Sequence, residues 1–69
     1  MRRKYIKPGK VYVGVGGNER EVRKILAKGE IEYQFTKKVG KGRGMLGGIY
    51  RCDIQTFCTF AKSIKSIVE

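Results

Sequence analysis

Residues 10–35 read KVYVGVGGNEREVRKILAKGEIEYQF, and this stretch decides the fold. Valines occupy every second position from 11 to 15, and Ile31, Tyr33 and Phe35 alternate with polar residues. A period of two is typical of a β-strand, because successive side chains point to opposite faces. The Gly-Gly-Asn at 16–18 can adopt the positive φ angles of a tight hairpin loop. The stretch therefore predicts an antiparallel sheet that begins with a hairpin.

Residues 19–28, between these two strands, fit two interpretations. A helix would begin with a capping box between Asn18 and Glu21, and a glycine would end it. A strand would give a three-stranded meander with short turns, and it would need a bulge or a strong bend between Val22 and Ile25. The short turns on both sides favour the strand, and the helix remains the alternative.

The second half of the chain contains a loop, a short strand and a helix. Residues 36–48 include five glycines and four cations, which predicts a long, flexible, basic loop. Residues 49–52 fit a short strand. Asp53 is placed to cap a helix over about residues 56–68, in which apolar residues recur every three or four positions. The predicted fold is mainly β with one C-terminal α-helix, as a small barrel or a strongly bent antiparallel sheet.

The composition indicates a small basic binding protein. The chain has 69 residues and a net charge of +10, from 16 Lys and Arg against 6 Asp and Glu. This length allows one domain over residues 1–69, and 41% hydrophobic residues are enough to expect folding. A domain this small buries only about 60% of its unfolded surface, which disfavours a deep catalytic cavity. Because the chain also contains no His, the usual proton-transfer residue, we expect no enzyme.

The sequence predicts no metal, no cofactor and no membrane span. We expect Cys52 and Cys58 to be free thiols in a reducing cytoplasm, and two Cys without His fall short of a zinc site. Apolar runs reach only two or three residues, far below the ~20 of a membrane span. Residues 42–47 match G-x-G-x-x-G, but they lack the strand and helix that a dinucleotide site requires.

All of the net charge lies in two segments. Residues 1–18 and 36–52 each contain five cations and no acid, whereas the remaining residues are neutral in sum. A basic N-terminal arm (1–9) and the glycine-rich loop (36–48) could follow the phosphates of a nucleic acid, DNA or RNA, and tyrosines beside the loop could stack on unpaired bases. The candidate nucleic-acid-binding residues are Arg2, Arg3, Lys4, Lys37, Lys38, Lys41, Arg43, Arg51, Tyr12 and Tyr50.

Two alternatives remain open at this point. A basic protein of this size could instead be a modulator or inhibitor that binds an acidic surface of a host protein or nucleoprotein. The aromatic residues could also form a cage for methylated lysine or arginine, although a core this small is expected to use most of them for packing.

Residues 7–26, KPGKVYVGVGGNEREVRKIL, resemble the opening hairpin of KOW-type and related SH3-like barrels. Those barrels begin with a glycine, alternating valines, a glycine turn and a Val-x-x-Ile strand. The whole chain, with its closing helix, is similar to short SH3-like proteins of phages and prophages. The Lys-Gly-x-x-Gly turn typical of KOW elements is replaced here by residues 17–21, GNERE. The resemblance implies an SH3-like barrel that binds nucleic acid or ribonucleoprotein through its loops.

Overall fold

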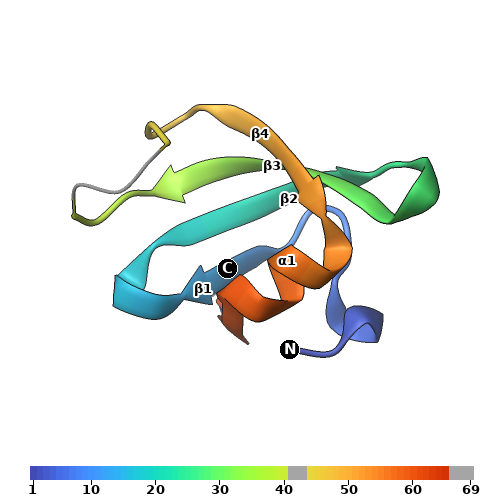
Figure 1. Ribbon diagram of the computed structural model, residues 1–69. Coiled ribbons are helices and arrows are strands. Elements are labelled where there is room, and N and C mark those ends of the chain that lie inside the picture. The colour runs from blue at the N-terminus through green and yellow to red at the C-terminus, as the bar shows by residue number, and fades with distance from the viewer. Residues whose placement is uncertain (41–43, 66–69) are drawn as a thin grey trace.

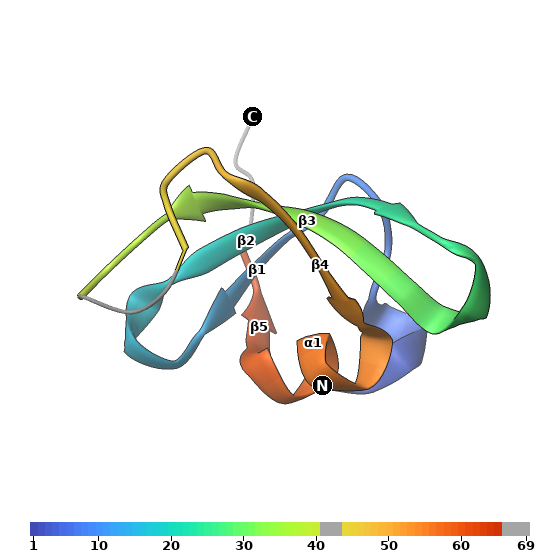
Figure 2. The ribbon, with the colours of Figure 1, turned by 45° about the horizontal axis from the view of Figure 1, so that its top comes forward.

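The computed structural model describes residues 1–40 and 44–65 and contains one bent, five-stranded antiparallel sheet. The strand order is β4-β3-β2-β1-β5. The sheet arches over a single α-helix (Figures 1 and 2). Mainly β structure with one helix towards the C-terminus is therefore confirmed, and the sheet is bent but not closed. The elements are η1 (Arg3–Tyr5), β1 (Val11–Gly14), η2 (Val15–Gly17), β2 (Glu19–Ile25), η3 (Ala27–Gly29), β3 (Glu30–Lys37), β4 (Ile49–Asp53), α1 (Ile54–Phe60) and β5 (Ala61–Ile64).

The ambiguous segment is a strand, β2, which pairs with both β1 and β3. Its register with β3 shifts between Val22 and Lys24, where the strand interpretation required a bulge or a bend. The helical signals at this position are overridden because a central strand has backbone partners on both sides and places Val22 in the core.

The alternation expected in β1 is present, and its buried face is that of Tyr12 and Gly14. Tyr12 is fully buried, and its hydroxyl donates to the Tyr5 carbonyl (2.5 Å) and accepts from the Lys7 backbone N–H (2.8 Å). The prediction that Tyr12 stacks on bases is therefore wrong: its ring packs edge-to-face on Phe57, and its one polar group is already satisfied.

The C-terminal helix is shorter than predicted. Asp53 does cap it, since its Oδ1 accepts from the Thr56 backbone N–H at 2.8 Å. However, α1 ends at Phe60, and β5 follows and pairs with β1. The helix is shorter because β1 pairs with β2 on one side only, and residues 61–64 form interstrand hydrogen bonds with its other side. The end of the predicted helix, residues 66–68, lies outside the described residues.

The N-terminal segment is packed rather than free. Ile6 is buried, η1 contacts α1, and the Met1 nitrogen donates to the Cys58 carbonyl at 2.9 Å. The expected arm (1–9) is therefore anchored to the body of the protein. The core that it joins consists of Ile6, Tyr12, Val22, Ile31, Tyr33, Phe35, Phe57, Cys58 and Ala61.

Candidate functional site

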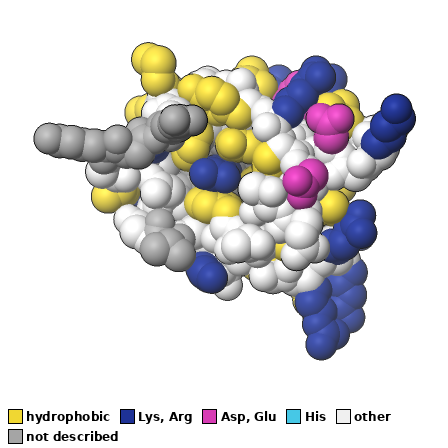
Figure 3. All heavy atoms as spheres, viewed as in Figure 1, with side chains coloured by type: hydrophobic (Ala, Val, Ile, Leu, Met, Phe, Trp, Pro, Cys, Tyr) yellow, Lys and Arg dark blue, Asp and Glu magenta, His cyan; other side chains and the backbone are white. Residues whose placement is uncertain are grey.

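The guanidinium of Arg20 lies among aromatic rings on the inner face of the sheet. Its Cζ is 3.8 Å from the ring centroid of Phe60 and 4.8 Å from the centroids of Tyr33 and Phe35. All three distances fall within the roughly 6 Å at which a cation is attracted to a ring face. Figure 3 shows this side of the molecule, where a basic side chain lies in a hollow among hydrophobic ones.

Arg20 is held by rings rather than by an acid. Within the described ranges its Nε is buried and has no hydrogen-bond acceptor. The neighbouring Glu19, which is also buried, pairs with Lys65 instead (3.0 Å between Nζ and Oε1). A buried donor without an acceptor typically costs about 1–3 kcal/mol. The arrangement leaves a positive charge whose hydrogen-bonding capacity is not fully used by the described part of the chain.

A half-open cavity of about 280 Å³ lies beside this guanidinium, lined by Arg20, Tyr33, Phe35, Gly44 and Tyr50. We call it the Arg20 pocket. Gly44 has a φ of +98°, and a Cβ there would collide with the Phe35 ring, so the loop can approach the ring this closely only through glycine. The Tyr50 hydroxyl accepts from the Met45 backbone N–H (3.1 Å), which ties the Tyr50 ring to the loop.

Burial also favours the neutral forms of Tyr33 and Cys52, two titratable side chains near Arg20. It raises the pKa of Tyr33, and the Arg20 guanidinium offsets part of that rise. Burial likewise raises the pKa of the Cys52 thiol, again opposed by Arg20. Both groups are therefore neutral near pH 7, and Arg20 supplies the positive charge of the pocket.

The pocket lies at the end of the sheet from which the basic loop leaves. Lys37 and Lys38 follow Phe35 by two and three residues, and they are exposed and half-exposed, respectively. The ends of the loop are held by backbone hydrogen bonds: Gly47 donates to the Phe35 carbonyl (2.8 Å), and Phe35 donates to Gly48 (3.2 Å). Lys41 and Arg43, and the flexibility predicted for that part of the loop, lie outside the described residues.

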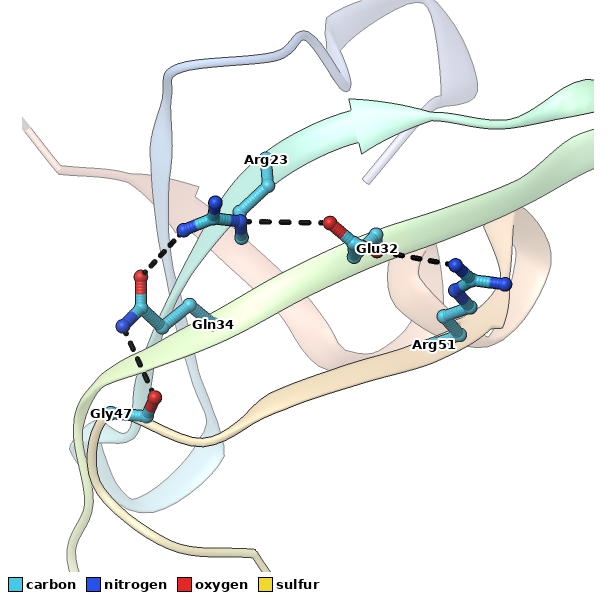
Figure 4. A network of polar contacts seen from close by, with 5 residues as sticks. All are labelled: Arg23, Glu32, Gln34, Gly47 and Arg51. Carbon is cyan, nitrogen blue, oxygen red and sulfur yellow. Dashed lines mark hydrogen bonds and ion pairs between the residues drawn. The ribbon is translucent and has the colours of Figure 1, made fainter.

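Arg51 is not part of the pocket, because it belongs to a polar network on the outer face of the sheet (Figure 4). Glu32 is 3.5 Å from Arg51 Nη2 and 3.6 Å from Arg23 Nε. Arg23 also donates to Gln34, which donates to the Gly47 carbonyl. Arg51 is thus already paired, as an exposed ion pair of the kind worth at most about 1 kcal/mol.

The N-terminal cations Arg2, Arg3 and Lys4 are exposed but lie far from the loop. Figures 1 and 2 both place the N-terminal segment at the opposite end of the molecule from residues 37–40 and 44–48, and the largest extents are 30 × 28 Å. The described cations of the two basic segments therefore do not form one continuous patch. Of the predicted residues, Tyr50 lines the Arg20 pocket, and Lys37 and Lys38 lie where β3 ends and the loop begins.

Arg20 is not among the residues predicted from the sequence, although a signal for it exists. In a strand, Arg20 shares a face with Val22, so a basic residue occupies the apolar face of β2. The pattern is weak, because Val22 is the one apolar residue on that face and Lys24 follows it. Within residues 1–40 and 44–65, no three His, Cys, Asp or Glu side chains are grouped so as to hold a metal ion, and no helix is long and apolar enough to cross a membrane.

Comparisons with protein family models, with curated proteins and with solved structures find no match to this chain. The small, β-rich fold is compatible with an SH3-like shape.

Proposed function

We propose that this protein binds nucleic acid at the loop end of its sheet. The observation that carries the proposal is the position of the basic, glycine-rich loop, which leaves the sheet next to an aromatic pocket containing a cation. Nucleic acids present phosphates and planar bases side by side, and cations beside aromatic rings match both features.

Each part of this end has a distinct role in the proposal. Lys37 and Lys38 contact phosphates and release condensed counterions, which provides affinity without sequence preference. Glycines in the loop let its backbone approach the phosphates without Cβ clashes. The N-terminal cations lie at the other end of the molecule, so they contact only a nucleic acid that is long enough to extend from the loop to them.

The expected relationship to SH3-like and KOW-type barrels, including those of phages, remains part of this proposal. The small, β-rich fold is compatible with it, and nucleic-acid binding through loops is what the resemblance implies. A non-enzymatic role and a cytoplasmic location also belong to the proposal, supported by the absence of His and by two free cysteines.

A second candidate function is binding to an acidic protein surface. Three apolar side chains favour it, because Met45, Leu46 and Ile49 are 73%, 67% and 51% exposed at the loop end. Exposed apolar groups next to cations are typical of protein interfaces, whose centres are apolar. Recovery of the protein from cell lysate with and without nuclease separates the two candidates, since only a nucleic-acid partner is lost on digestion.

A direct test titrates ¹⁵N-labelled protein with a short single-stranded oligonucleotide and follows the backbone amide signals. We expect the largest shifts at residues 36–40 and 44–48 and small ones at residues 2–4. Absence of any shift at low salt would contradict nucleic-acid binding, and shifts confined to the N-terminal segment would contradict the proposed location.

A further inference from the structure

We infer that the Arg20 pocket holds one unpaired nucleobase, so that the protein prefers single-stranded nucleic acid. This inference rests on the proposed function and assigns a particular ligand group to the pocket. Its basis is the composition of the walls, which consist of three aromatic rings, one guanidinium and one glycine.

A cationic ligand does not fit these walls. Aromatic cages bind methylated lysine or arginine by placing the cation against ring faces. Here Arg20 already occupies that position against Tyr33, Phe35 and Phe60. A second cation would meet an uncompensated like charge in a partly buried site, which is unfavourable. The aromatic-cage alternative raised from the sequence is therefore disfavoured.

A bare inorganic anion fits no better. Among the lining residues Arg20 is the one charged group, and the rest of the wall is largely ring carbon. An anion entering the pocket would lose its hydration and find one cation in exchange, and burial of a charge is costly unless its remaining hydrogen bonds are made. Phosphate is better accommodated outside the pocket, beside Lys37 and Lys38.

A nucleobase matches the pocket in size and chemistry. The volume of about 280 Å³ is just below the roughly 300–1,000 Å³ of typical ligand pockets, which suits one planar ring system rather than a whole cofactor. Bases stack on aromatic rings and on guanidinium planes. Arg20 covers Tyr33 and Phe35, so Tyr50 and the guanidinium itself are the surfaces that a base can stack on. The carbonyl oxygens and ring nitrogens of a base can accept hydrogen bonds from Arg20, and its sugar-phosphate leads out toward the loop lysines.

The test compares two probes that carry the same phosphates. One is a fluorescein-labelled oligothymidylate of about eight nucleotides, within the usual site size of a small single-strand binder. The other has the same backbone with abasic sites throughout. Stacking of one base corresponds to about a 5- to 150-fold gain in affinity, so we expect the abasic strand to bind weaker by that factor.

Variants then locate the effect in the pocket. Tyr50→Leu and Arg20→Lys, neither of which changes the net charge, should weaken binding of the normal strand by about 5-fold or more, the lower limit for one stacked base, and leave the abasic strand unaffected. Tyr50→Phe keeps the ring and should retain the preference. Tyr5→Leu is the matched control, because Tyr5 is an exposed tyrosine at the other end of the molecule. Circular dichroism verifies that each variant is folded. If Arg20→Lys does not fold, the result for Tyr50→Leu alone decides whether the base lies in the pocket.

Different results would overturn the nucleobase inference and the proposed nucleic-acid binding. Equal, salt-dependent binding of both strands would overturn the nucleobase inference and leave nucleic-acid binding intact. A preference for the normal strand that survives Tyr50→Leu would also overturn it, since the base would then lie elsewhere. Failure of both strands to bind at low salt would overturn the proposed function itself, and the inference with it.

Discussion

Replacing Gly14 with alanine puts a methyl group into space that the Phe60 ring fills. A Cβ at position 14 would lie within 3.0 Å of three atoms of that ring, so the ring or β1 must move. The φ of −110° is accessible to alanine, so the cost is one of packing rather than of backbone strain. Overpacking of this kind typically costs about 1–3 kcal/mol. A domain of 69 residues has only about 3–10 kcal/mol of stability, so the loss is large.

Thermal unfolding followed by circular dichroism measures this loss. At about 4–8 °C per kcal/mol, we expect Gly14→Ala to lower the Tm by roughly 4–24 °C. Phe60→Leu removes part of the ring, so the double variant should lose less than the sum of the two single losses, by about 1 kcal/mol. Because Phe60 also forms one wall around Arg20, the result bears on the site. Unchanged stability of Gly14→Ala, or strict additivity, would refute this packing.

Three further outcomes are expected. Burial raises the pKa of Tyr12 and of Tyr33, so both side chains stay protonated in the folded protein at a pH where they ionise in the unfolded chain. The free energy of unfolding should therefore be constant below a pH of about 10 and fall above it. Urea denaturation at several pH values measures this. Hydrogen bonds from the first turn of α1 lower the pKa of Asp53. Its contribution to the free energy of unfolding is therefore present above its ordinary pKa and is lost as the pH falls through the lowered pKa. An Asp53→Asn variant should lack this dependence on acid pH. Gly44→Ala should lower the Tm more than Gly40→Ala, because both positions have positive φ but only Gly44 faces a ring, and equal losses would contradict the close approach at the pocket.

Much of the fold could be predicted because local patterns and tertiary structure agree. Alternation identified β3, the Val22 to Ile25 spacing indicated the bulge in β2, and Asp53 marked the start of α1 within two residues. The end of α1 could not be predicted, since residues 61–64 become a strand through pairing with β1, which is distant in sequence.

The site was predicted only in part. Charge and glycine content identified the basic loop, and Tyr50 does line the Arg20 pocket. Tyr12 was a candidate for base stacking because the alternation in β1 separates two faces without showing which of them is buried. Arg20 of β2 and Phe60 at the end of α1 meet only in the folded molecule, and no spacing along the chain indicates that contact.

The most direct test of nucleic-acid binding at the loop end is the dependence of affinity on salt concentration. Log K for a short single strand should fall linearly with log salt. Lys37→Gln combined with Lys38→Gln removes two phosphate contacts, so the slope should flatten by about 1.4, at roughly 0.7 per contact. Arg2→Gln combined with Lys4→Gln removes the same charge from the opposite end and should leave the slope nearly unchanged. A slope that flattens in the N-terminal variant and not in the loop variant would contradict the account.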